Sequence, residues 1–367
     1  QQKYPHITIS PEYLGADGYW DKLNTLVAGG NAPDLIQLGN NYVDYVNRGA
    51  IMDITSLVGD VIDLSNFDES IAKTGYVNGK QYGINLGSNA LGIMYNKTLI
   101  ESVGMELPKE GWTWEEFEEY SKQLVQKLGQ GKYAFADQSG FTHYVGHFVR
   151  QKGKALYTGD AIGFDEQDVA EWFTMWDRFR QEGLIPTAEM TASYTETSPD
   201  NSLLIEGKVA MVVIWSNQLK GFQNATQDVL DMVPLPQGGE HLGMWVQPSQ
   251  FLSINAKSEH PREAAMFISF FVNDPEATAI LGSDRGIPGS AVVRDALKAD
   301  ADEVTMRTYD YFSTAVKYTR EMDTEMPNIN EWDQALRNAS QKVAFKAGSV
   351  EEAARETVEA ARYAISH

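Results

Sequence analysis

The chain has 367 residues, a length that corresponds to about two domains at roughly 150 residues each. Its 30 Lys and Arg against 51 Asp and Glu give a net charge of −21, which repels phosphate backbones and anionic lipid surfaces and argues against nucleic-acid binding as the main function. The absence of Cys excludes disulfides, thiolate metal sites and cysteine nucleophiles.

The apolar runs and the first residues contain no membrane or export signal. The most apolar stretch, Val209–Trp215, is far shorter than the ~18 residues that a membrane-spanning helix requires. Residues 1–5 lack the apolar core of a signal peptide and resemble the end of a helix. We therefore expect the numbering to begin inside a longer precursor.

The first 40 residues alternate between strand and helix patterns. Residues 6–13 predict a strand, because apolar and polar side chains alternate there. Residues 18–27 predict a helix that ends at Gly29-Gly30, and residues 34–38 predict a short buried strand. Two strands around a helix indicate a βαβ unit and a mainly parallel sheet.

Later helices are marked by capping signals and by apolar residues at helical spacing. Thr113-Trp-Glu-Glu116 and Ser349-Val-Glu-Glu352 are capping boxes, each of which predicts that a helix begins there. The spacing predicts two more helices over residues 168–181 and 261–273. Further strands are predicted over residues 81–86, 92–95, 209–215 and 250–255. This alternation is typical of an α/β protein.

No motif for a metal or for catalysis is complete. His143 and His147 share the i, i+4 spacing of a helical metal pair, but a Tyr stands where the zinc-peptidase motif has Glu, and no third ligand is indicated, which favours structural or exposed histidines. Among 51 acids, no carboxylate pair of a glycosidase is marked. No serine-hydrolase elbow, P-loop or dinucleotide fingerprint occurs. We expect no metal, no cofactor and no catalytic residue.

Aromatic residues beside amide and hydroxyl side chains are the notable chemical feature. Trp215-Ser-Asn-Gln218 directly follows an apolar strand, and Met244-Trp-Val-Gln247 precedes another. In α/β sheets, ligands bind beyond the carboxyl ends of strands. A sugar presents apolar faces ringed by hydroxyls, so a flat aromatic wall with amide partners suits it. The same residues could instead pack beneath loops.

The order of segments resembles the family 1 extracellular solute-binding proteins of carbohydrate ABC importers, the group similar to maltose-binding protein. Two of the segments that carry this resemblance are Ala-Gly-Gly-Asn-Ala-Pro-Asp within residues 26–36 and Glu206-Gly-Lys-Val-Ala-Met211 before Trp215. The other resembling segments are residues 49–55, 81–84, 92–97, 112–117, 267–275 and 325–329.

The sequence departs from the family pattern in two places. The strand and helix that normally precede the segment aligned with residues 1–5 are missing, which suggests a truncated or incompletely recorded chain. The acidic ligand residue that the maltose-binding branch carries in its crossing segment is replaced by Ser88-Asn89. The second departure argues against maltose-type specificity.

The resemblance implies a two-lobed α/β fold, each lobe a mainly parallel sheet flanked by helices, with a ligand cleft at the hinge. We expect residues 1–87 and 250–304 in the N-terminal lobe, without its first strand, and residues 88–249 and 305–367 in the C-terminal lobe. The implied ligand-binding residues are Trp215, Trp245, Gln247, Asn40, Asn41, Ser88, Asn89, Asp17, Tyr19, Gln138 and Phe141.

The function implied by the resemblance is non-catalytic capture of a mono- or oligosaccharide and its delivery to the membrane permease of an ABC importer. The protein would be a monomer outside the cytoplasm, either lipid-anchored or periplasmic, without nucleic-acid partners. Two alternatives stay open. One is a secreted carbohydrate-active hydrolase or lyase with an unmarked acid pair, and the other is a receptor for a non-sugar solute.

Overall fold

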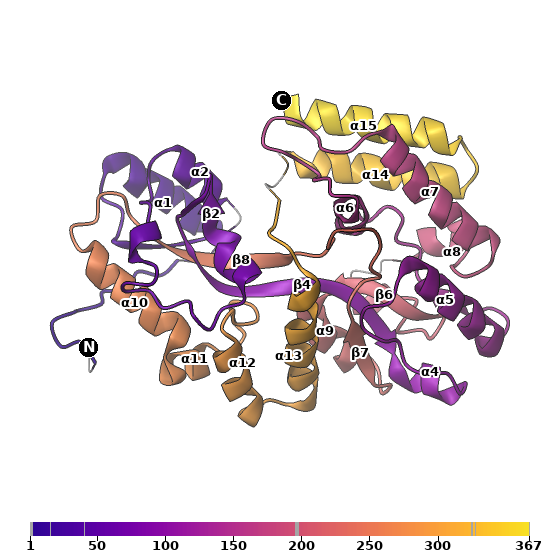
Figure 1. Ribbon diagram of the computed structural model, residues 1–367, viewed down its shortest axis with the longest axis horizontal. Coiled ribbons are helices and arrows are strands. Elements are labelled where there is room, and N and C mark those ends of the chain that lie inside the picture. The colour runs from indigo at the N-terminus through magenta and orange to yellow at the C-terminus, as the bar shows by residue number, and fades with distance from the viewer. Residues whose placement is uncertain are drawn as a thin grey trace. The chain divides into compact units, whose positions relative to one another are not determined.

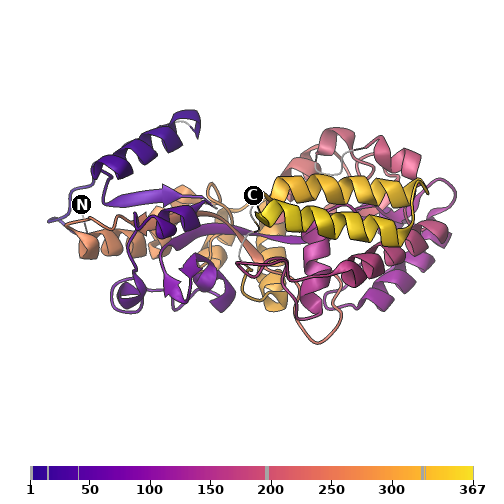
Figure 2. The same ribbon diagram turned by 90° about the horizontal axis from the view of Figure 1, so that it is seen from above.

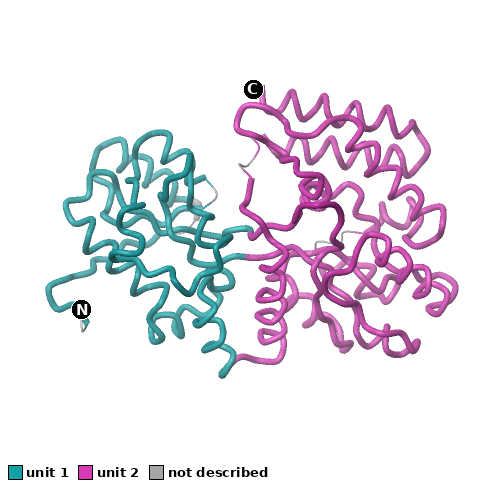
Figure 3. The backbone as a smooth tube through the Cα atoms, in the orientation of Figure 1, with its two compact units in different colours: residues 1–88, 247–300 teal, residues 89–246, 301–367 magenta. Residues whose placement is uncertain are grey.

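The computed structural model describes residues 3–14, 16–39, 41–194, 198–323, 326 and 328–366, with Ala16 and Asp17 described by their backbone only. The chain divides into two compact units (Figure 3). Unit 1 contains residues 1–88 and 247–300, and unit 2 contains residues 89–246 and 301–367. The chain therefore passes from one unit into the other three times. The lobe boundaries expected from the sequence, at 87/88, 249/250 and 304/305, remain a prediction.

Unit 1 is built on strands β1, β8 and the first part of β4. β1 runs antiparallel to β8, with Leu35 opposite Ile254 and Leu38 opposite Phe251. Its other described elements are short or helical. The elements are α1 (Ala16–Gly29), β1 (Leu35–Leu38), α2 (Tyr42–Asn47), α3 (Glu69–Ala72), β2 (Tyr76–Val77), β3 (Lys80–Gln81), β4 (Ile84–Asn96), β8 (Val246–Ile254), α10 (Pro261–Asn273), α11 (Pro275–Leu281), α12 (Ala291–Leu297) and the 3-10 turns Thr55–Leu57, Lys73–Gly75 and Lys298–Asp300.

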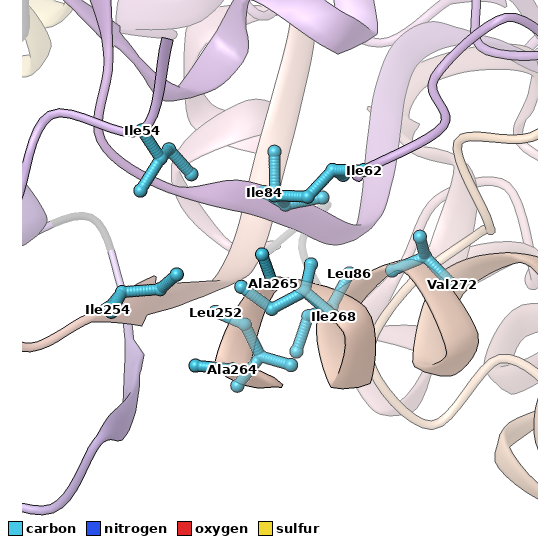
Figure 4. Packing of buried hydrophobic residues seen from close by; sticks show 10 residues of the cluster. All are labelled: Ile54, Ile62, Ile84, Leu86, Leu252, Ile254, Ala264, Ala265, Ile268 and Val272. Carbon is cyan, nitrogen blue, oxygen red and sulfur yellow. The ribbon is translucent and has the colours of Figure 1, made fainter. Parts of the chain in front are cut away.

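One hydrophobic cluster of unit 1 consists mainly of buried residues of α1, α2, β1 and β8, and a second forms a core between α10 and the sheet (Figure 4). Alternate residues of β4 and β8 face this core, while α10 contributes apolar residues at helical spacing, which are the periodicities that strands and helices impose. The buried side chains are Ile54, Ile62, Ile84, Leu86, Leu252, Ile254, Ala264, Ala265, Ile268 and Val272.

The strand predicted over residues 6–13 is wrong. Residues 7–14 form no regular element, and among the described residues no backbone hydrogen bond to residues 8–14 is found. A strand requires a neighbour that completes its ladder. Here β1 pairs with β8, and residues 8–14, α1 and β1 line a groove of about 860 Å³. Residues 6–13 therefore have the alternating pattern of a strand but, in the described part of the chain, no neighbouring strand with which to pair.

The strands predicted separately over residues 81–86 and 92–95 belong largely to one 13-residue strand, β4. Gly87 and Gly92 do not end the strand. Each instead allows another part of the chain to approach the strand closely, because glycine has no side chain. A Cβ on Gly87 would lie 2.2 Å from the Arg285 carbonyl oxygen, and one on Gly92 would lie 2.1 Å from the Tyr311 hydroxyl. Glycine inside a strand commonly marks such a contact.

Unit 2 contains the rest of the helices and a sheet in the order β7-β4-β6-β5. Its core helices include α14 and α15, which lie side by side (Figures 1 and 2), and α7, which packs on α15. The elements are α4 (Lys97–Ser102), α5 (Trp114–Leu128), β5 (Tyr133–Phe135), α6 (Thr142–Gln151), α7 (Glu166–Gln181), α8 (Ala188–Ala192), β6 (Val209–Trp215), α9 (Leu219–Asn224), β7 (Leu230–Val233), α13 (Glu303–Ala315), α14 (Ile329–Ala344), α15 (Val350–Ser366) and the 3-10 turns Pro199–Asn201, Ser216–Gln218 and Val316–Tyr318.

The predicted α/β class, with a sheet flanked by helices, is confirmed, but the expectation of mainly parallel strands is wrong for the pairs whose register is defined. β1 with β8, β4 with β6, and β4 with β7 are all antiparallel, and β5 with β6 is parallel. The reason is that β4 and β8 carry the chain between the two units, so their direction is set by that passage rather than by a βαβ crossover.

The local signals for helices are confirmed. Thr113 accepts a hydrogen bond from the Glu116 amide while the Glu116 side chain accepts one from the Thr113 amide, which completes the capping box of α5. Ser349 accepts from the Glu352 amide at the start of α15. In the parts of the chain that the structure describes, no helix is both long and apolar enough to cross a membrane.

Candidate functional site

Strand β6 places Trp215 at the edge of the unit 2 sheet. Residues 209–214 are buried, as expected for a strand flanked by β4 and β5, whereas Trp215 is only half-buried. Its backbone amide donates to the Gln218 side-chain oxygen at 2.9 Å, so the chain turns immediately after the ring. The prediction that an aromatic side chain stands where this strand ends is therefore confirmed.

Helix α6 brings His143 against Trp215 and Trp245. The imidazole meets the Trp215 ring edge-on, with centroids 5.1 Å apart, and stacks on the Trp245 ring at 5.9 Å and an interplanar angle of 29°. The two tryptophan rings are 6.3 Å apart. Phe141, just before α6, lies 5.4 Å from His143. We call these four residues the aromatic cluster.

Trp245 is the more buried of the two tryptophans, with 8% of its surface exposed, and its ring packs against α6. Gly146 leaves room for the ring, since a Cβ there would lie 3.4 Å from the tip of Trp245 and 3.0 Å from Leu156. The Arg150 guanidinium lies 5.5 Å from the centre of the Trp245 ring, within the range of a cation–π interaction.

Arg150 is itself buried and is held by several partners. Its Nε donates to the Gly243 carbonyl at 2.9 Å, one terminal nitrogen donates to the Glu321 carbonyl at 2.6 Å, and the other forms an ion pair with Asp323. Burial lowers the pKa of Arg150, and Asp323 opposes that change. The guanidinium thus joins the segment before Trp245 to residues 321–323 and holds the ring from behind.

Polar groups lie beside Trp215. Ser216 is fully buried, and its hydroxyl accepts a hydrogen bond from the Ala90 amide at 3.1 Å. The same hydroxyl is 3.5 Å from the side-chain oxygen of Asn89, which is half-buried. A flat aromatic ring and an amide side chain therefore occur together in unit 2, which is the combination that suits a sugar.

His143 was interpreted from the sequence as a structural or exposed residue, and its place in the cluster was missed. Its Nδ1 is buried and has no hydrogen-bond partner among the described residues. Burial lowers the pKa of His143, and the negative charge of Asp333 partly opposes this. The structural interpretation does hold for His147, which is fully buried, contacts the Pro236 carbonyl at 2.7 Å and has its pKa lowered by burial to about 4.

Gln138, a predicted ligand contact, pairs with the backbone of β6. Its side-chain nitrogen donates to the Val213 carbonyl at 2.7 Å, and its side-chain oxygen accepts from the Val213 amide at 2.6 Å. Both ends of the amide thus extend the ladder at the edge of β6. A role for Gln138 in ligand binding remains a prediction.

The predicted residues of unit 1 occupy varied positions. Ser88 is fully buried, and its hydroxyl accepts from Asn85 at 2.8 Å. Tyr19 is half-buried and donates to the Gln37 carbonyl at 2.6 Å, and burial raises the pKa of its hydroxyl. Asn41 is exposed, and Gln247 is half-buried on β8. Asn40 and the side chain of Asp17 lie outside the described residues.

The structure therefore brings together Trp215, Trp245, Phe141 and Asn89 of the predicted set, all within unit 2. The groove in unit 1 includes Tyr19 among its walls, but its lining contains none of the other predicted residues whose side chains are described. Within the described residues, no group of three or more His, Asp or Glu is arranged to hold a metal ion.

The fold and the aromatic cluster can be compared with those of known proteins. The model of the bacterial extracellular solute-binding protein family matches residues 1–308, and the chain belongs to that family. The resemblance noted in the sequence is thus confirmed. The description of the family as extracellular also agrees with the predicted location outside the cytoplasm.

Known relatives support the same assignment. A solved family 1 extracellular solute-binding protein from Alicyclobacillus acidocaldarius is 28% identical, with a TM-score of 0.91 over 100% of this chain and 92% of that chain. The diacetylchitobiose binding protein DasA of Streptomyces coelicolor is 28% identical over 78% of this chain and 67% of its own length. The matches to putative binding proteins of Brucella, at 25% identity, span 59% of this chain but only about half (53%) of those relatives.

Proposed function

We propose that the protein is a non-catalytic receptor that binds a mono- or oligosaccharide on the aromatic cluster of unit 2 and delivers it to the permease of an ABC importer. The observation that carries the proposal is the half-buried Trp215 at the end of β6, with Asn89 beside it. The stacking face binds the apolar side of a sugar ring, and the amide exchanges hydrogen bonds with its hydroxyls.

Two further observations support a neutral sugar as the ligand. The relative DasA is named for binding diacetylchitobiose, a carbohydrate. The net charge of −21 opposes the capture of polyanions. Of the ligand residues expected from unit 1, Asn40, Asn41, Ser88, Asp17, Tyr19 and Gln247 stay predictions, and so does closure of the two lobes around the ligand. Attachment by a lipid anchor is likewise a proposal.

A thermal-shift screen of the protein against neutral mono- to tetrasaccharides tests the proposal. A ligand present at 100 times its Kd stabilises the folded state by about 2.7 kcal/mol, which gives a measurable rise in Tm. Titration calorimetry on each hit then gives the Kd of wild type and of Trp215→Ala. Removing a stacking tryptophan from a binding site costs about 2 kcal/mol or more, so we expect the Kd of this variant to rise at least roughly 30-fold.

The matched control is Tyr363→Ala, which removes an exposed aromatic side chain from α15 in the same unit and is expected to leave the Kd unchanged. Equal Kd values for wild type and Trp215→Ala contradict the proposed site. The sugar is recovered after binding and analysed for chain length. Intact sugar supports a receptor, whereas shortened products favour the hydrolase or lyase alternative. A rise in Tm with amines alone would favour a non-sugar solute.

A further inference from the structure

His143 combines three properties that a purely structural histidine of the aromatic cluster does not need. It lies against both Trp215 and Trp245. Its Nδ1 is buried without a partner. No hydrogen bond of its Nε2 is found within the described residues either, and the residue as a whole is only half-buried. The buried Nδ1 of His147 also has no partner, so this property alone does not mark a ligand contact. What distinguishes His143 is that it also lies against both tryptophans with an Nε2 that has no hydrogen bond within the described residues.

We propose that His143 is a polar contact of the bound sugar, in which the neutral imidazole uses Nε2 to donate a hydrogen bond to a hydroxyl of the ring that stacks on Trp215. This inference rests on the proposed function and adds to it a residue that selects a hydroxyl at one position of the sugar. The edge-on contact with Trp215 fixes the imidazole beside the stacking face, and the stacked contact with Trp245 limits its rotation.

The neutral form of His143 is favoured by its surroundings. Protonation would place a second charged N–H at Nδ1, where the described residues offer no acceptor. Burial accordingly lowers the pKa of His143. The charged groups that bear on it are Asp333 on α14, which pairs with Arg337, and Arg150 on its own helix, behind Trp245. Asp333 opposes the effect of burial without cancelling it.

A bound sugar would remove water from the remaining exposed side of the imidazole and disfavour the charged form further. Binding and protonation of His143 therefore oppose each other. Sugar affinity should be constant at neutral and higher pH and should fall on acidification through the pKa of His143 in the free protein, which lies below the ordinary histidine value because of burial. A histidine that only fills space in the cluster would produce no such pH dependence of the Kd.

Calorimetric titration with the best sugar from the screen, at pH values from 8 to 5, tests the proposal on three proteins. We expect wild type to bind more weakly at pH 5 than at pH 7.5. His143→Gln keeps a donor without titrating, so its Kd should lose most of this pH dependence. His143→Phe keeps a ring without a donor, and its Kd at pH 7.5 should rise about three- to ten-fold, the value of one hydrogen bond.

His260→Gln removes an exposed histidine of unit 1 and should keep the wild-type pH dependence. Because His143→Phe could fail to fold, the imidazole is also followed by NMR in the wild type. Its signal is assigned by its loss in His143→Gln, and we expect the sugar to shift it and to lower its pKa. An unchanged pH dependence in His143→Gln, or an imidazole signal unaffected by sugar, overturns the inference alone. A wild type that binds no sugar overturns both this inference and the proposed function.

Discussion

Gly146 on α6 is expected to control the position of Trp245. In Gly146→Ala, the new Cβ would lie 3.0 Å from the Leu156 Cδ1 and 3.4 Å from the tip of the Trp245 ring. Alanine in a helix interior is more stable than glycine by about 0.5–1 kcal/mol. Overpacking of a buried site costs about 1–3 kcal/mol, so the substitution should give a net destabilisation of about 1 kcal/mol.

Gly221→Ala is the matched control for this substitution. Gly221 lies in α9 of the same unit, and a Cβ there would contact nothing within 4 Å. This variant should therefore gain only the stability that alanine has over glycine in a helix, about 0.5–1 kcal/mol. The free energies of unfolding of both variants come from urea denaturation, followed by circular dichroism because both changes lie in helices.

Sugar affinity provides a second measurement on the same two variants. Displacement of Trp245 by a few tenths of an ångström should weaken binding several-fold in Gly146→Ala, since precise positioning of a contact affects affinity strongly, and should not affect Gly221→Ala. If both alanine variants gain the same stability and bind sugar equally well, then Gly146 does not set the position of Trp245, and the argument from packing is wrong.

Two more variants test the supports of the aromatic cluster by urea denaturation. Arg150→Met leaves Asp323 and the carbonyls of Gly243 and Glu321 without their donor, and it should cost about 3–5 kcal/mol. Arg48→Met removes an exposed guanidinium that lies over Tyr45 and should cost at most about 1 kcal/mol; equal losses would contradict the role of Arg150. Gln138→Leu leaves the Val213 amide and carbonyl unpaired and should cost about 1–3 kcal/mol, and a loss of sugar affinity without a loss of stability would instead identify Gln138 as a ligand contact.

Local sequence signals determined the helices well, because their causes are local. The capping box at Thr113 and the apolar spacing of residues 261–273 depend on residues within a few positions of each other, and α5 and α10 begin where these signals predict. The strand ending at Trp215 was predicted by the same kind of signal, a continuous apolar run that is buried on both faces.

Strand partners and strand directions were decided by the tertiary structure. Residues 6–13 have a strand pattern but no neighbour to pair with, so the pattern alone did not produce a strand. The sequence predicted two strands where β4 is one, and within β4 Gly92 leaves room for the Tyr311 hydroxyl, which comes from a helix more than 200 residues later. Such contacts have no signature at short sequence separation.

The candidate site shows the same division. The sequence marked Trp215 and Trp245 through their polar neighbours, because a tryptophan beside amide and hydroxyl side chains is an unusual local pattern that can be recognised without knowing the fold. It did not mark His143 as a ligand contact, since a histidine within a helix has the same sequence pattern whether it is structural or binds a ligand. Only the packing of α6 against the end of β6 placed that imidazole between two tryptophans 72 and 102 residues away, and distances across such separations are fixed by the fold rather than by spacing along the chain.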